Sequence, residues 1–194
     1  MLSHEELVLD TQRVLDLGDH DFRKQYRRAL RKNPAFTVSR YTPRDIGDLV
    51  VFLENWRNGR TEEQNAIARI ENDLNFLAAF GQESFVQGTI IRDDGKVIGY
   101  NIFVPYFGDA CVSVFGKVLR GYENLGVFLT YEKCKAMHSA GFSQVYLSGM
   151  NTDFKKSMRW AGETISIVAE RIYKGDRHNF RTTPEPYLDS LTWS

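Results

Sequence analysis

The residues best placed for chemistry are two cations at the junction between a predicted strand and a predicted helix. Alternating apolar residues end at Lys117, Arg120 follows three positions later, and helical spacing begins at Glu123. The first N–H groups of a helix and its dipole attract anions, so we expect an anionic or carbonyl-bearing ligand at this junction. We expect Lys117 and Arg120 to bind phosphate there, and solvation at the surface is the alternative.

Glu132 is a carboxylate among the apolar residues of the helix predicted over 123–140. The residues that share its face are Leu125, Phe128, Leu129 and Ala136. A carboxylate on a buried stripe is costly unless it is paired or opens into a pocket. We therefore expect Glu132 to act as a general base or to bind an amine. The alternative is a place at the edge of the stripe, paired with Lys or Arg.

A dense basic patch lies on the helix that Phe22, Tyr26, Ala29 and Leu30 predict before Asn33 and Pro34. Its cations are Arg23, Lys24, Arg27, Arg28, Arg31 and Lys32. The whole chain carries 25 Lys and Arg against 25 Asp and Glu, so only a local patch can attract a polyanion. We expect this patch to bind RNA phosphates or lipid headgroups, and a solvated helix face is the alternative.

Several other chemistries are excluded by spacing. Cys111 and Cys134 match no metal or disulfide pattern and are expected to be buried thiols, and the four histidines are scattered. No Ser-His-Asp or Cys-His arrangement can be argued, which disfavours a covalent acyl-enzyme. We expect no metal site.

Length and composition predict one folded domain with an accessory element. The chain has 194 residues, 42% of them hydrophobic, with no leader-like start and no run long enough for a membrane span. We therefore expect a cytoplasmic protein.

Periodicity and turn signals predict the order of elements. A capping box at Ser3 and Glu6 predicts a helix ending at Gly18, so residues 1–33 are expected to form a helical hairpin. Beyond it we expect a strand over 36–41, helices beginning at Thr42 and Thr61, strands over 84–92, 96–106 and 110–117, the helix over 123–140, a strand over 142–147, a helix over 153–160 and a strand over 163–173.

This order, from Ala35 to Tyr173, resembles the GNAT-like acyltransferases. The resemblance implies an α/β (α+β) fold, with a mixed, mostly antiparallel sheet flanked by helices, over a domain of residues 34–194. It also implies that the fourth and fifth strands of the family part to admit the acyl donor. In the family's coenzyme-A turn a glycine stands three residues after Arg120, where this chain has Glu123. This departure argues against ordinary coenzyme A use.

A closer resemblance is to the C-terminal half of lysylphosphatidylglycerol synthases and to Fem-type transferases, which take an amino acid from aminoacyl-tRNA. The pieces that carry it are residues 26–32, 38–43, Gly141-Phe142 and Phe154-Lys155-Lys156-Ser157-Met158. The resemblance gives Lys155 the role of contacting the carbonyl and phosphate region of the donor. Lys156 and Arg159, on the same predicted helix, are expected to meet phosphates. Because such enzymes usually have two GNAT-like halves, a homodimer or a second half is a possible partner.

These observations predict an aminoacyl-tRNA-dependent transferase that acts on an amine or hydroxyl of a small molecule, peptide or lipid. Its partners would be tRNA and that acceptor, with no cofactor beyond the co-substrate. An acyl-coenzyme-A or acyl-carrier N-acyltransferase is one alternative. A non-catalytic module that binds RNA or protein is the other.

Overall fold

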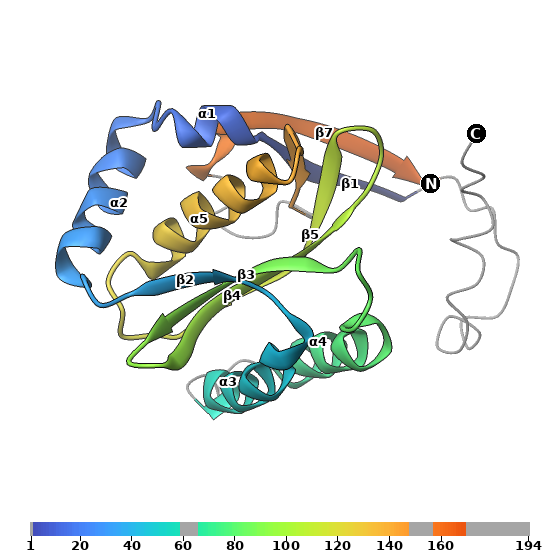
Figure 1. The fold of residues 1–194 in the computed structure, drawn as a ribbon. Helices are drawn as coiled ribbons and strands as arrows, with labels where there is room; N and C mark the ends of the chain where they lie inside the picture. Colours follow the sequence, from blue (N-terminus) through green and yellow to red (C-terminus); the bar gives the residue numbers. More distant parts are fainter. Residues whose placement is uncertain (1, 59–65, 148–156, 170–194) are drawn as a thin grey trace, which may run out of the picture.

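The protein folds around one seven-stranded sheet with helices on both faces (Figure 1). A computed structural model describes residues 2–58, 66–147 and 157–169. The strands are β1 (Leu2–Asp10), β2 (Thr37–Arg40), β3 (Gln87–Asp93), β4 (Lys96–Pro105), β5 (Ala110–Val118), β6 (Gln144–Tyr146) and β7 (Gly162–Ala169). The helices are α1 (Thr11–Leu15), α2 (His20–Lys32), α3 (Ile46–Asn58), α4 (Ala66–Phe80) and α5 (Leu125–Ser139), with 3-10 turns at Pro43–Asp45 and Arg159–Ala161.

The sheet order is β2-β3-β4-β5-β6-β1-β7, and only the β5–β6 contact is parallel. The predicted meander is confirmed: β3, β4 and β5 pair antiparallel through short turns. Asp94 and Gly95 both have positive φ, as the tightest hairpin turns require. α5 then crosses over the sheet and returns the chain to β6, which lies beside β5.

The first segment is a strand, so the helix predicted from Ser3 to Gly18 is wrong. β1 pairs antiparallel with β7 on one edge and with β6 on the other. Leu7 and Leu9 are fully buried while Val8 is partly exposed, which is the period of two expected of a strand. Pairing on both edges outweighs the local capping signal. Residues 1–33 are therefore no helical hairpin, because their first third lies inside the sheet.

The helices predicted before Asn33, after Thr42 and over 123–140 are confirmed as α2, α3 and α5, whereas the predicted start at Thr61 lies outside the described residues. Asp19 caps α2 by accepting a hydrogen bond from the Phe22 backbone N–H, 2.8 Å. The capping box at Thr42 and Asp45 opens the 3-10 turn that leads into α3. The helix predicted over 153–160 lies mostly outside the described residues.

The sheet buries side chains on both faces, in one cluster on the side of α3 and α4 and in two on the side of α1, α2 and α5 (Figure 1). On the side of α3 and α4, residues such as Phe52, Leu53 and Ile102 are buried with Tyr100. On the side of α1, α2 and α5, Met137 packs with Phe103, Cys111 and Val145 of the sheet, in the same buried cluster as Leu7 and Leu9. α5 therefore lies on the sheet over β3, β4 and β5. None of the helices in the described part of the chain combines the length and hydrophobicity needed to cross a bilayer.

Candidate functional site

β5 and β6 part after three residues. They pair only at Ala110–Val112 with Gln144–Tyr146, whereas β5 continues to Val118. No other described strand pairs with that edge of β5. From Ser113 onward, the backbone N–H and C=O groups of β5 that point away from β4 therefore have no partner in another described strand, and this is the edge to which a ligand can add. The predicted parting of these two strands is confirmed.

A bulge shapes β5 where the parting begins. Ile102 pairs with Phe115 and Phe103 pairs with Ser113, so Val114 is an extra residue in β5. Asn101 of β4 stabilises the bulge, because its Nδ2 donates to Ser113 Oγ at 2.8 Å and to the Phe115 carbonyl at 2.5 Å. Bulges of this kind re-aim side chains beside functional sites.

The turn between β5 and α5 presents a helix N-terminus. Gly121 adopts φ +94°, which favours glycine, and Asn124 adopts φ +57° without capping α5 through its side chain. The first N–H groups of α5 therefore have no side-chain cap and remain available to an anion. Arg120 is exposed in this turn, in agreement with its predicted place. Its phosphate role stays a prediction.

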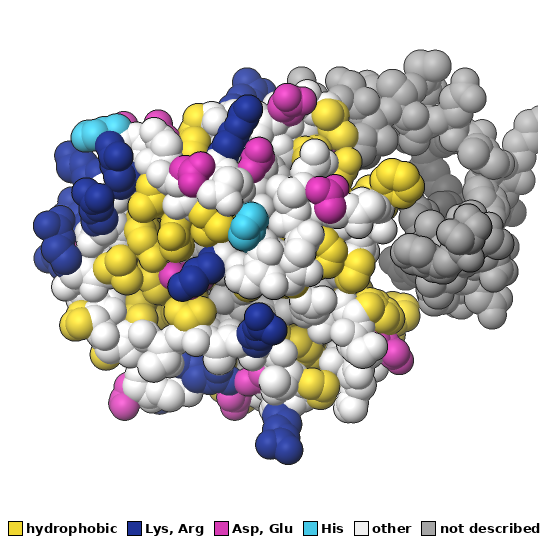
Figure 2. Space-filling model, turned by 45° about the horizontal axis from the view of Figure 1, so that its top comes forward, with side chains coloured by type: hydrophobic (Ala, Val, Ile, Leu, Met, Phe, Trp, Pro, Cys, Tyr) yellow, Lys and Arg dark blue, Asp and Glu magenta, His cyan; other side chains and the backbone are white. Residues whose placement is uncertain are grey.

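The basic patch on α2 lies next to this turn. Lys24, Arg27, Arg31 and Lys32 are exposed, and Figure 2 shows the dark blue cations gathered over α2 beside a hydrophobic area. Arg28 Nε lies 2.7 Å from Glu123 Oε1 in the turn. Arg23, the sixth member, is partly buried. The Glu123 carboxylate, which would oppose a bound phosphate, is thus neutralised by Arg28 of the patch.

Glu132 does not reach the opening. It lies between α5 and α2, where Tyr26 donates its hydroxyl to Oε1 at 3.1 Å and Lys135 Nζ lies 3.9 Å from Oε2. Burial, followed by the charge and hydrogen bond of Glu132, raises the pKa of Tyr26, so the phenol stays a donor. These contacts agree with the alternative given for Glu132, a carboxylate paired with a lysine, and a role as general base stays a prediction.

Lys117 also has a different place from the one predicted. Its side chain points to the α3–α4 face, is 9% exposed, and brings Nζ to 2.5 Å from Asp73 Oδ2. The same ammonium lies 5.3 Å from the centroid of the Trp56 ring. A cation held this way stabilises the core, and a phosphate at the opening on the other face would not meet it.

The predicted donor-binding segment is described only at its end. Lys155 and Lys156 lie outside the described residues. Arg159 is exposed in the 3-10 turn before β7. The roles of these three residues stay predictions.

The cysteines are buried and free, as predicted. Burial raises the pKa of Cys111 to about 12 and that of Cys134 to about 11. Both thiols are therefore protonated at neutral pH, and neither supplies a thiolate nucleophile.

Sequence reasoning missed Lys133. It lies on α5, is only 8% exposed, and forms no hydrogen bond or ion pair with any described residue. Burial lowers its pKa. The signal was available, because Gly126, Thr130, Lys133 and Met137 share one helical face and Lys133 is the charged member of that face.

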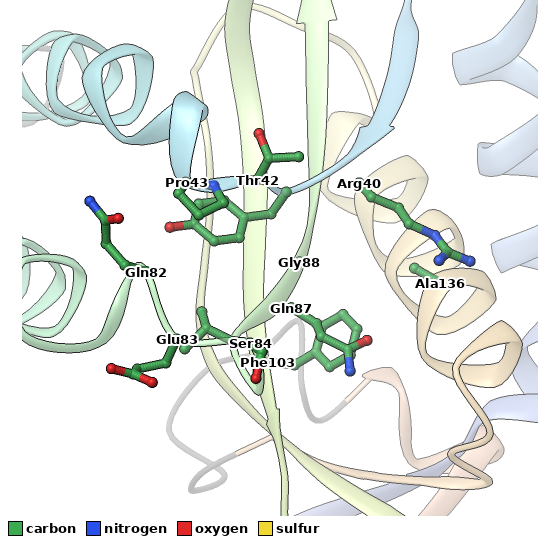
Figure 3. A pocket seen from close by; sticks show the side chains of 12 residues that line it. Arg40, Thr42, Pro43, Gln82, Glu83, Ser84, Gln87, Gly88, Phe103 and Ala136 are labelled. Carbon is green, nitrogen blue, oxygen red and sulfur yellow. The ribbon is translucent and has the colours of Figure 1, made fainter.

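A separate hollow of about 410 Å³ lies at the edge of the sheet where β2 ends (Figure 3). Its lining includes Arg40, Glu83, Gln87, Phe103 and Ala136. Arg40 and Glu83 stand at opposite ends of the hollow, so they do not converge on one point (Figure 3). We assign no chemistry to it.

Comparisons with known proteins support the transferase interpretation of this geometry. Residues 4–176 match the family described as phosphatidylglycerol lysyltransferase, C-terminal. No curated protein matches the chain.

Solved structures share the fold at low sequence identity. FemX superposes with a TM-score of 0.63 at 10% identity, over 82% of this chain and 59% of FemX. L-PGS from Bacillus licheniformis gives 0.53 at 16% identity, over 78% of this chain and 48% of that protein. The GCN5-related glucosamine N-acetyltransferase region of a fungal multi-domain beta-N-acetylglucosaminidase gives 0.56 at 12% identity, over 85% of this chain and 20% of that protein.

The chain thus spans less than two thirds of each of these proteins. The mixed sheet, the parting of β5 from β6 and these superpositions agree on a GNAT-like fold. With a family match that covers residues 4–176, the chain belongs to the family of the C-terminal domain of phosphatidylglycerol lysyltransferase, a family of transferases.

Proposed function

We propose that this protein moves an aminoacyl group from charged tRNA to a hydroxyl or amine. The opening between β5 and β6 carries the proposal, because it offers an unpaired strand edge next to the N-terminus of α5. An ester carbonyl can accept hydrogen bonds from such an edge while a phosphate lies against the helix N-terminus.

The cations of α2 favour RNA as the donor's carrier. They border the β5–α5 turn, to which Arg28 is joined through Glu123. A nucleic acid entering the opening would meet this patch with its phosphate backbone. A donor as small as coenzyme A would not need a cationic face of this size.

The turn itself is poorly suited to the pyrophosphate of coenzyme A. Glu123 stands where the coenzyme-A pattern requires glycine, and its carboxylate is 44% exposed beside the turn. Arg28 pairs with that carboxylate, so the missing glycine, which would let the backbone approach the pyrophosphate closely, is the stronger argument against coenzyme A. We therefore place acyl-coenzyme A second as a donor.

The acceptor is proposed from the family's name. A phosphatidylglycerol lysyltransferase joins lysine to a lipid hydroxyl, so phosphatidylglycerol vesicles are the first acceptor to test. The donor ester is already activated, so the enzyme must align the acceptor, remove its proton and stabilise the oxyanion.

A discharge assay tests the proposal. The purified protein is incubated with a mixture of charged tRNAs and, in a separate reaction, with acyl-coenzyme A, each with phosphatidylglycerol vesicles. We expect loss of aminoacyl ester with the first donor alone, and Lys155→Ala to abolish it without lowering Tm. Lys135→Ala, another lysine substitution on an exposed position, serves as the control. Discharge of acyl-coenzyme A alone would overturn the proposal.

The RNA contact has its own test. Arg27→Ala with Arg31→Ala removes two exposed cations of the patch, and Arg44→Ala with Arg57→Ala removes two exposed cations near α3. The first pair should lower the slope of log affinity for tRNA against log salt by about 2, because each phosphate contact contributes roughly 0.9. The second pair should leave the slope unchanged. Equal effects would refute a localised RNA face.

A further inference from the structure

The face of α5 that lies on the sheet is unusually polar and small where it covers β5. Gly126, Thr130 and Lys133 occupy this face together with Met137, which packs on Cys111 and Phe103. A Cβ added at Gly126 would meet no atom within 4 Å. The fold therefore leaves open space beside Gly126.

Polar side chains of the sheet lie under this face. Thr89 and Asn101 are direct partners on β3 and β4, and Asn101 bonds to Ser113 on β5. Thr89 Oγ1 and Asn101 Oδ1 are buried without a hydrogen-bond partner in the described part of the chain. Orphaned buried polar atoms of this kind require a reason beyond packing.

Lys133 approaches β5 close to the bulge. The thiols with which its charge interacts are Cys134, next to it on α5, and Cys111, two residues before Ser113. These two thiols are the only titratable groups shown to interact with it in the described region, and only their thiolate forms would favour its charged form. Neither is an anion at neutral pH, so the amine has no counter-charge there.

A buried ammonium without an anion is destabilising, and a lysine at such a position is therefore suited to act as a neutral amine. Glu132, the base predicted from the sequence, accepts a hydrogen bond from Tyr26 between two helices, whereas the Lys133 amine has no such partner among the described residues. Burial lowers the pKa of Lys133, which favours the neutral amine that can accept a proton.

We infer that Lys133 is the general base of the transfer: its Nζ takes the proton from the acceptor beside the bulge of β5. This inference rests on the proposed function. The acceptor oxygen or nitrogen then bonds to the ester carbonyl carbon, giving a tetrahedral oxyanion. When the oxyanion collapses, the bond to the ribose oxygen breaks, and that oxygen takes the proton back from Lys133.

Substitution at Lys133 separates this role from a structural one. Lys133→Met keeps the length of the side chain and should lower the transfer rate 100-fold or more, the range of general bases. Its Tm should stay equal or rise, because an unpaired amine leaves the core, whereas a structural lysine would lower Tm when replaced. Lys133→Arg keeps the charge and cannot act as a base, so it should be equally inactive. Lys135→Met on the exposed side of α5 is the matched control.

Chemical labelling tests the amine without any donor. Competitive acylation across pH, followed by mass spectrometry, should show Lys133 reacting as an amine of lower pKa than Lys135. The transfer rate of the unaltered protein should rise with pH through the value so measured.

Three results would overturn the inference. They are an ordinary labelling profile for Lys133, a Lys133→Met protein within fivefold of the unaltered one, and an active Lys133→Arg protein. Failure of the unaltered protein to discharge charged tRNA would reject the proposed function, and the labelling result would still decide the state of Lys133.

Discussion

Two buried lysines lie on opposite faces of the same sheet and have opposite surroundings. Lys117 on the α3–α4 face is paired with Asp73, at 2.5 Å, and lies over the Trp56 ring. Lys133 on the α5 face has two protonated thiols as its electrostatic neighbours. The first lysine is paired within the protein, whereas the second forms no hydrogen bond or ion pair with a described residue. Burial alone therefore does not distinguish a structural lysine from a reactive one, whereas the partner does.

The largest expected effect on stability comes from breaking the ion pair between Lys117 and Asp73. Lys117→Met leaves the Asp73 carboxylate, which is 2% exposed, without its cation and should destabilise the fold by about 3–5 kcal/mol. Urea unfolding measures the change. Lys117→Met combined with Asp73→Leu should recover much of the loss, because neither charge is then buried. If the double variant is no more stable than the single one, the pair is not the source of the loss.

A smaller loss of stability is expected at Tyr100, which also contacts Asp73. Tyr100 donates its hydroxyl to Asp73, and burial keeps the pKa of the phenol well above its usual value. Tyr100→Phe should therefore cost about 1.5–3 kcal/mol, the range of a hydrogen bond to a charged group. The same urea titration measures it, with Tyr106→Phe as a control at an exposed tyrosine. If Tyr100→Phe lowers the unfolding free energy no more than Tyr106→Phe does, the Tyr100 hydroxyl does not stabilise the fold through Asp73.

The contact of Asp45 with Arg92 can be tested by titration, because it lowers the pKa of the Asp45 carboxyl. Burial raises the pKa of Asp45, but hydrogen bonds from Thr42 and Arg92 outweigh it, so the folded pKa lies below the usual value. Its stabilisation is then present above the unfolded pKa of 3.8 and is lost as pH falls below it. Unfolding free energies at pH 5 and pH 2.5 should differ by about 1 kcal/mol more in the unaltered protein than in Asp45→Asn. If the unaltered protein and Asp45→Asn lose the same unfolding free energy between pH 5 and pH 2.5, the lowered pKa assigned to Asp45 is contradicted.

The smallest effect on stability is expected at Arg28. Its ion pair with Glu123 is about half exposed on both sides, so Arg28→Ala should change the unfolding free energy by less than about 1 kcal/mol. Its effect on tRNA affinity should be larger, because Glu123 then repels phosphate at the turn. Filter binding at two salt concentrations checks this. Restored binding in Arg28→Ala with Glu123→Gln would attribute the loss to the freed carboxylate.

Local sequence signals predicted most of the elements correctly. The capping residues Asp19 and Thr42, the Asp94-Gly95 turn and the glycine after α5 act within a few residues, so their structural effects could be seen in the sequence. The N-terminal strand was missed because the hydrogen bonds of β1 come from β6 and β7, more than 130 residues away. The Ser3–Glu6 pattern carries no information about those distant partners.

The sequence by itself determined the order of elements from β2 to β6, the GNAT-like arrangement that follows from it and the cationic face of α2. Only the tertiary structure decided which charges are free to act. Asp73 lies 44 residues from Lys117, and Tyr26 lies 106 residues from Glu132, so their contacts exist only after the sheet and helices have packed. The electrostatic state of a side chain depends on the groups within a few ångströms of it, and for residues this far apart in the chain the fold alone decides which groups those are.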